Sequence, residues 1–150
     1  MHIYGEDHSP EERDRIESEI LKEHAKSPYK FLLSEELGPH SWRVNELDSA
    51  IANKEWAISD RSLHLAKKMG IPAIGIDTWD PEVYQKGVKH SFKLRERTMM
   101  DILKKYEDKH VAVIVGDTHL RTISTPELGP ASPLHNLTAT IQRSRNPEIA

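Results

Sequence analysis

The chain has 150 residues and carries 21 Lys and Arg against 24 Asp and Glu, a formal net charge of −3. This length suits one compact domain, and a hydrophobic fraction of 37% can build a core. The balanced charge disfavours a general nucleic-acid binder, and no apolar run approaches the roughly 18 residues of a membrane span. Because there is no cysteine, disulfides, thiolate catalysis and Cys-ligated metal sites are excluded. We expect a cytoplasmic protein with no nucleic-acid or membrane partner, since residues 1–10 also lack the pattern of a signal peptide.

Four short apolar segments predict the strands of a sheet. The last of them is a continuous run of Val, Ala and Ile, which is typical of a strand buried on both faces. The third has a proline near its start, a position that a strand tolerates. The four segments are residues 2–4, 29–33, 71–76 and 111–115.

Helical patterns lie between these segments. Ser9 has the features of an N-cap, because Pro10 follows it and Glu12 stands three residues later. Gly70 closes a further pattern in the manner of a C-cap residue. The predicted helices are residues 10–25, 45–53, 60–69 and 91–106.

Alternating strands and helices predict an α/β fold with a mainly parallel sheet of about four core strands flanked by helices. We expect residues 1–123 to form a single α/β domain. Residues 124–150 contain several prolines and are expected to be a C-terminal extension that packs on this domain or extends from it. A short element at 137–142 is expected there, of a type that the pattern does not decide.

Acidic, histidine and hydroxyl residues follow every predicted strand. The carboxyl ends of parallel strands meet at one edge of a sheet, where α/β proteins form their sites. We therefore expect these clusters to converge on a candidate site. Its members are Glu6 and His8 after the first strand, Glu35 and Glu36 after the second, Asp77 and Trp79 after the third, and His119 after the fourth.

The first and fourth clusters share the pattern Gly-x-x-His, which ends in His8 and His119. An imidazole can act as a general base near neutral pH, and two imidazoles with a carboxylate can hold a divalent metal. Side-chain alternation places Glu35 and Glu36 on opposite sides of their strand without deciding which side faces the site. Each Gly-x-x-His can also arise by chance, and the aspartates within the two motifs can serve as helix N-caps.

The ordered set of motifs resembles the superfamily that joins the TIKI/TraB proteins, the ChaN-like proteins and the erythromycin-esterase type hydrolases. The resemblance covers residues 1–37 and 92–122. The matching motifs are Gly5-Glu6-Asp7-His8, the strand and glutamate of residues 31–37, Arg97-Thr98-Met99-Met100, and residues 113–120 with the second Gly-x-x-His. Members of that superfamily are usually longer between the second and the last core strand, so a cap is missing here or comes from another subunit of a homo-oligomer.

The resemblance implies a hydrolase of an ester or peptide bond that acts on a small molecule or a peptide. His8 or His119 would deprotonate water, directly or through a divalent metal such as Mn, Co or Zn. Glu35 or Glu36 would orient that histidine, and Glu35 is the expected third metal ligand beside the two histidines. Arg97 would bind a substrate carboxylate or stabilise an oxyanion.

Four further residues are expected to contact the substrate. Glu6, Asp77 and Trp79 directly follow predicted strands, although a tryptophan is more often a packing residue. His40 belongs to the loop of residues 38–42, which could close over the site.

Two other functions fit some of these features. The same histidines could bind haem or a metal without turnover, although only 6% of the residues are aromatic. The segment Asp117-Thr118-His119 suggests the Asp-x-His motif of metallophosphoesterases. That family places the motif after its first strand, whereas here it follows the last, and no Gly-Asn-His is present.

Overall fold

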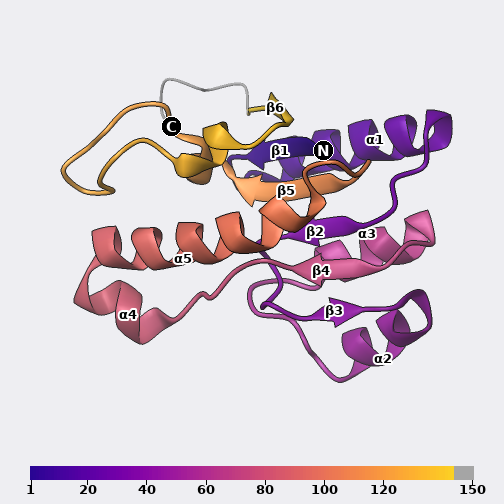
Figure 1. Cartoon of the computed structure of the whole chain (residues 1–150). Helices are drawn as coiled ribbons and strands as arrows, with labels where there is room; N and C mark the ends of the chain where they lie inside the picture. Colours follow the sequence, from indigo (N-terminus) through magenta and orange to yellow (C-terminus); the bar gives the residue numbers. More distant parts are fainter. Residues whose placement is uncertain (144–150) are drawn as a thin grey trace.

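A six-stranded sheet forms the centre of the computed structural model, which describes residues 1–143 (Figure 1). The strand order is β3-β4-β2-β5-β1-β6, and all neighbours are parallel except β3 and β4. The strands are β1 His2–Glu6, β2 Leu32–Ser34, β3 Ser41–Trp42, β4 Ala73–Gly75, β5 Ala112–Gly116 and β6 Thr140–Gln142. The predicted α/β class is confirmed, and the four predicted strands are β1, β2, β4 and β5.

Helices cover both faces of this sheet. Ser9 caps α1 through its side chain, which accepts a hydrogen bond from the Glu12 amide as its pattern predicts. Gly70 ends α3 in the left-handed conformation, with φ of 70°, which glycine adopts without a Cβ clash. The helices are α1 Pro10–Lys26, α2 Leu47–Ala52, α3 Arg61–Met69, α4 Pro81–Lys86 and α5 Val88–Leu103. Four 3₁₀ turns span Val44–Glu46, Lys104–Tyr106, Asp117–Leu120 and Pro133–Asn136.

Side chains on the two faces of the sheet enter separate cores. In β1, Tyr4 packs with α1, α2 and α3, whereas its neighbour Ile3 packs with α5 and the 3₁₀ turn at Pro133–Asn136. This division follows from the alternation of side chains along a strand. Because helices cover both faces, β5 is buried along its whole length, as its continuous apolar run predicts.

Two strands and one helix go beyond the expected elements. β3 pairs antiparallel with β4 at one edge, and β6 extends the sheet beside β1 within the segment 137–142 whose type was undecided. α4 begins with Asp80 as N-cap and Pro81 in its first turn, the same signal that starts α1. In residues 1–143, no helix is both long and apolar enough to cross a membrane.

Candidate active site

The carboxyl ends of the parallel strands meet at a cavity of about 530 Å³. Its lining combines residues that follow β1, β2 and β5 with one side of α5 and the segment before and within α4. The polar members of the lining include His8, Glu35, Arg95 and His119, and the apolar members include Trp79, Phe92 and Leu128. The structure therefore brings both Gly-x-x-His histidines and Glu35 to one cavity.

His8 stands at the mouth of this cavity, directly after β1. Its Nδ1 atom lies 2.8 Å from Oε1 of buried Glu6, while its side chain is 72% exposed. The backbone of His8 has φ of 68°, a left-handed conformation that is uncommon for residues other than glycine. The hydrogen bond to Glu6 raises the pKa of His8, against the opposing effect of burial. The imidazole is thus fixed at one nitrogen and accessible to solvent.

His119 lies between two carboxylates beneath the cavity. Its Nε2 atom is 3.1 Å from Oε2 of Glu35, and its Nδ1 atom is 2.9 Å from Oε2 of Glu96. The ring stacks on Phe92 with centroids 4.8 Å apart. Arg121 closes the row with two hydrogen bonds to Glu96, of 2.5 and 3.0 Å. His119 is only 2% exposed, so it acts as the centre of a buried ionic cluster.

The neighbouring charges in this cluster keep His119 and Glu35 in their ionised forms. Burial lowers the pKa of His119, but the adjacent carboxylates of Glu35 and Glu96 raise it, to about 9. Burial likewise raises the pKa of Glu35, but the charges of His119 and Arg95 lower it, to about 2. At neutral pH His119 is therefore an imidazolium between two carboxylates.

Arg95 forms the second part of the cluster. Its guanidinium donates two hydrogen bonds of 2.9 Å to Asp77, which follows β4, and one of 3.2 Å to Glu35. It also lies over the Trp79 ring, 5.0 Å from the centroid. These bonds use Nε and Nη2, which leaves Nη1 without a hydrogen bond in residues 1–143. Burial raises the pKa of Asp77, and the Arg95 hydrogen bonds oppose that change.

Gly116, the last residue of β5, is approached by the side chains of both Glu35 and His8. Its amide donates to Oε1 of Glu35. A Cβ at this position would lie 2.6 Å from Glu35 Oε1 and 3.0 Å from His8 Nε2. Glycine is therefore required for the close approach of both side chains, and His8 and Glu35 flank the same point at the end of β5.

Three expected site residues lie elsewhere. Glu36 pairs with Arg13 at 2.8 Å and accepts from Ser62 behind the sheet, since it leaves β2 on the opposite side from Glu35. Arg97 is exposed and lines another groove, because two residues along a helix turn it about 200° from Arg95. His40 is also exposed and lies at the sheet edge, where pairing of β3 with β4 holds its loop away from the cavity.

Arg95 and Glu96 are functional candidates that sequence reasoning missed, because charged residues on a helix are expected to be solvated, whereas both are buried here. Glu96 is spaced four residues after Phe92 and three before Met99, so it lies within the buried stripe of α5. A carboxylate within an apolar stripe was the available signal, because such a group needs a buried partner. Arg95 carries the same signal, since it lies three residues after Phe92 and four before Met99.

The arrangement fits a divalent metal poorly. Both nitrogens of His119 face carboxylates, and an imidazolium has no lone pair to offer a metal. Residues 1–143 contain no group of three or more His, Asp or Glu placed to hold an ion. The metal and the haem that the sequence suggested stay predictions.

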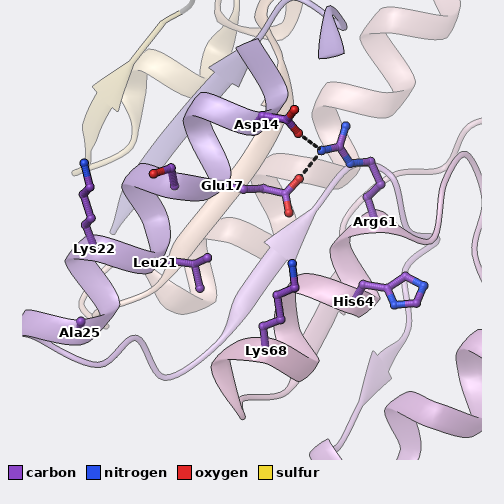
Figure 2. A pocket seen from close by; sticks show the side chains of 9 residues that line it. Asp14, Glu17, Leu21, Lys22, Ala25, Arg61, His64 and Lys68 are labelled. Carbon is purple, nitrogen blue, oxygen red and sulfur yellow. Dashed lines mark hydrogen bonds and ion pairs between the residues drawn. The ribbon is translucent and has the colours of Figure 1, made fainter. Parts of the chain in front are cut away.

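A separate hollow lies between α1 and α3, away from every expected site residue (Figure 2). Arg61 reaches across it to Asp14 at 2.8 Å and also pairs with Glu17. His64 and Lys68 of α3 line the same hollow. The Arg61 cation of this hollow is thus already paired with two carboxylates.

Comparisons with known proteins place the fold. No protein-family model matches the chain, and no curated protein matches it in sequence. The structure is similar to two solved structures of bacterial protein toxins, with TM-scores of 0.63 and 0.62 at 14% and 15% identity. It is also similar to RRSP, a MARTX toxin effector domain from Vibrio vulnificus CMCP6, with a TM-score of 0.56 at 15% identity.

These matches cover 95% of this chain but only 33%, 33% and 32% of the toxin chains. The chain therefore spans about a third of the length of the proteins that it resembles. At such identities the likeness establishes the fold alone.

Proposed function

We propose that this chain is a hydrolase in which His8 activates a water molecule against an ester or peptide bond. The observation that carries the proposal is the His8–Glu6 pair beside the buried Glu35–His119 ion pair, at the wall of one cavity. A base that is held at one nitrogen and open at the other is the arrangement that general base catalysis needs.

The reaction uses His8 first as a base and then as an acid. Its Nδ1–H donates to Glu6, so Nε2 carries the lone pair that accepts a proton from water. The hydroxide forms a bond to the carbonyl carbon, and the C–O or C–N bond then breaks. His8 returns the same proton to the leaving alcohol or amine. The Glu6 carboxylate stabilises the imidazolium between these two steps.

Arg95 is the candidate for stabilising the oxyanion. Its Nη1 is the one guanidinium nitrogen that no described carboxylate engages, and Arg95 lines the same cavity as His8. The Asp77 and Glu35 carboxylates hold the guanidinium plane in place before substrate binds. A fixed cation costs no reorganisation when charge develops, which is the basis of electrostatic preorganisation.

His119 is a positioning residue in this scheme. Both of its ring nitrogens face carboxylates, so it has no free nitrogen to accept a proton from water. It fixes the Glu35 side chain that borders both His8 and Arg95. The resemblance of the paired Gly-x-x-His motifs to the TIKI/TraB, ChaN-like and erythromycin-esterase superfamily supports hydrolysis, and it makes an ester or a peptide the substrate class to test first.

The test is a panel of fluorogenic esters and peptides assayed with the wild type, His8→Ala and His64→Ala. His64 is a matched control, because it also pairs with a carboxylate (Asp60, 3.1 Å) on the surface but lies outside the cavity. We expect His8→Ala to lose about 10²–10⁴-fold in kcat and His64→Ala to keep full activity. Equal activity of all three proteins, or no turnover of any substrate by the wild type, would reject the proposal.

Non-catalytic haem or metal binding is the second candidate from the sequence. The structure adds no observation in its favour, since the nitrogens of His119 are both engaged. Absorbance of the haem-incubated protein in the Soret region, with His8→Ala as control, tests it directly.

A further inference from the structure

We infer that a basic groove along α5 binds an acidic, extended segment of a polypeptide and delivers it to the cavity. The inference rests on the proposed function and names the substrate class. The groove has a volume of about 930 Å³ and lies between α5 and the segment 121–136. Its lining carries four exposed cations, Lys89, Lys93, Arg97 and Lys104, against a single acidic residue, Asp101.

The four cations have no partner within the described residues. None of them forms an ion pair or a side-chain hydrogen bond in residues 1–143. By contrast, Arg61 pairs with two carboxylates in the α1–α3 hollow, and Lys67 lies 2.6 Å from Asp48. The chain as a whole is negative, at −3, so the groove reverses the sign of the molecule over one surface. An unpaired basic surface of this kind is complementary to an anionic ligand.

The spacing of the cations favours an extended peptide. Lys89, Lys93 and Arg97 follow at four-residue intervals, which places them about 6 Å apart along the helix. Every second residue of an extended chain advances about 6.6 Å, so acidic side chains at alternate positions meet successive cations. The intervening side chains then face the apolar floor of the groove, which includes Met100, Leu128 and Pro133.

The same floor argues against a nucleic acid. Single-stranded nucleic acids are held by aromatic side chains on which the bases stack, as well as by cations. The groove lining contains no Phe, Tyr or Trp among the described residues. Its apolar members are Met, Leu, Ala and Pro, which suit aliphatic side chains rather than base rings.

The groove leads to the candidate active site. Leu128 lines both the groove and the cavity, and Val88 of the cavity lies between Gly87 and Lys89 of the groove. Arg121 forms part of the groove and bonds Glu96, whose Oε2 atom also contacts His119. A segment bound along α5 therefore runs toward the cavity that His8 lines together with Val88 and Phe92 of that helix.

Fluorescence anisotropy with a labelled peptide of alternating Glu and Leu tests the inference at physiological ionic strength. The comparison probes are the same peptide with Gln in place of Glu and a single-stranded oligonucleotide of equal charge. The variant is Lys93→Glu with Arg97→Glu. The control is Lys26→Glu with Lys30→Glu, which changes the net charge equally at exposed positions outside the groove. We expect the groove variant to weaken binding of the Glu peptide at least about tenfold and the control to leave it unchanged.

Several results would overturn the inference. They are no binding of the Glu peptide by the wild type, equal binding of the Gln peptide, equal loss in the control variant, and tighter binding of the oligonucleotide. Should the charge reversal unfold the chain, Lys93→Gln with Arg97→Gln serves instead, with unfolding followed by circular dichroism.

Activity measurements separate this inference from the proposed function. His8→Ala should bind the Glu peptide as the wild type does while losing turnover. Peptide binding without any cleavage by the wild type would reject the hydrolase and keep the groove. Conversely, cleavage whose KM for an acidic substrate is unchanged by Lys93→Glu with Arg97→Glu would reject the groove and keep the hydrolase.

Discussion

The Nε2 atom of His119 lies 3.1 Å from Oε2 of Glu35, and this pair joins the carboxyl ends of the neighbouring strands β5 and β2. Both side chains are buried, and each has a further partner of opposite charge, Glu96 for His119 and Arg95 for Glu35. The pair therefore holds the edge of the sheet on which His8 stands.

Replacing His119 should destabilise the protein. His119→Ala leaves Glu35 and Glu96 buried without the cation between them, and loss of one partner of a buried pair costs about 3–5 kcal/mol. Urea unfolding followed by circular dichroism measures the change. His64→Ala, at an exposed pair, should change stability by less than about 1 kcal/mol. Equal stability of the two variants would contradict the role given to His119.

The stability of the wild type should fall as the solution becomes alkaline. The pKa of His119 is raised from 6.5 to about 9 by its two carboxylates, so the folded state holds this proton more tightly than the unfolded state. The contribution of protonated His119 to the free energy of unfolding is complete below pH 6.5 and is lost as the pH rises through 9. The difference in unfolding free energy between the wild type and His119→Asn should shrink over this interval. A constant difference would show that folding does not raise the pKa of His119.

The activity should rise with pH through the pKa of His8, since only the neutral imidazole accepts a proton from water. Glu6 raises that pKa through its hydrogen bond. In Glu6→Gln the acidic limb of the kcat/KM profile should therefore move to lower pH, while the maximum falls because the imidazolium loses its stabilising charge. An NMR titration of the His8 ring gives the same shift independently of turnover. If neither the acidic limb of the kcat/KM profile nor the NMR-measured pKa of His8 moved in Glu6→Gln, Glu6 would have no part in the mechanism.

A methyl group at Gly116 should disrupt the site. In Gly116→Ala the added Cβ would lie 2.6 Å from Glu35 Oε1, so the carboxylate or β5 must shift, at a cost of about 1–3 kcal/mol. Turnover should fall together with stability. Gly38→Ala is the matched control, because a Cβ there meets no atom within 4 Å. Wild-type activity of Gly116→Ala would show that the approach of His8 and Glu35 is not needed.

Arg95 should not tolerate lysine. Lysine cannot donate the paired hydrogen bonds to Asp77 while also presenting a third nitrogen to the cavity. Arg95→Lys should lower kcat about 10²–10³-fold, the range found when an oxyanion donor is lost. Arg61→Lys is the control, because Arg61 also pairs with two carboxylates but lies in the α1–α3 hollow (Figure 2). This substitution should leave kcat unchanged. An equal effect of the two substitutions would reject the role of Arg95.

Local signals in the sequence determined much of this protein. The apolar run before Gly116 predicted a buried strand, the Ser9-Pro10 pair predicted the start of α1, and alternation of strands with helices predicted the parallel sheet. The direction of those strands was enough to predict that His8 and His119 meet at one edge together with one of the two glutamates, Glu35 or Glu36. Each of these inferences depends on residues close together in the chain or on the polarity of a parallel sheet.

Only the tertiary structure decided which residues complete the site. Whether Glu35 or Glu36 faces the cavity depends on which face of the sheet carries the site. That Arg95 meets Asp77 and Glu35 depends on how α5 packs against the ends of β4 and β2. A helix places residues two apart about 200° from each other, so Arg97 of the Arg-x-x-Met motif points away from the side that Phe92 and Arg95 share. The physical reason is that an ion pair such as Glu96 with His119 forms only when packing brings two distant segments together. Patterns of neighbouring residues in the sequence carry no information on that packing.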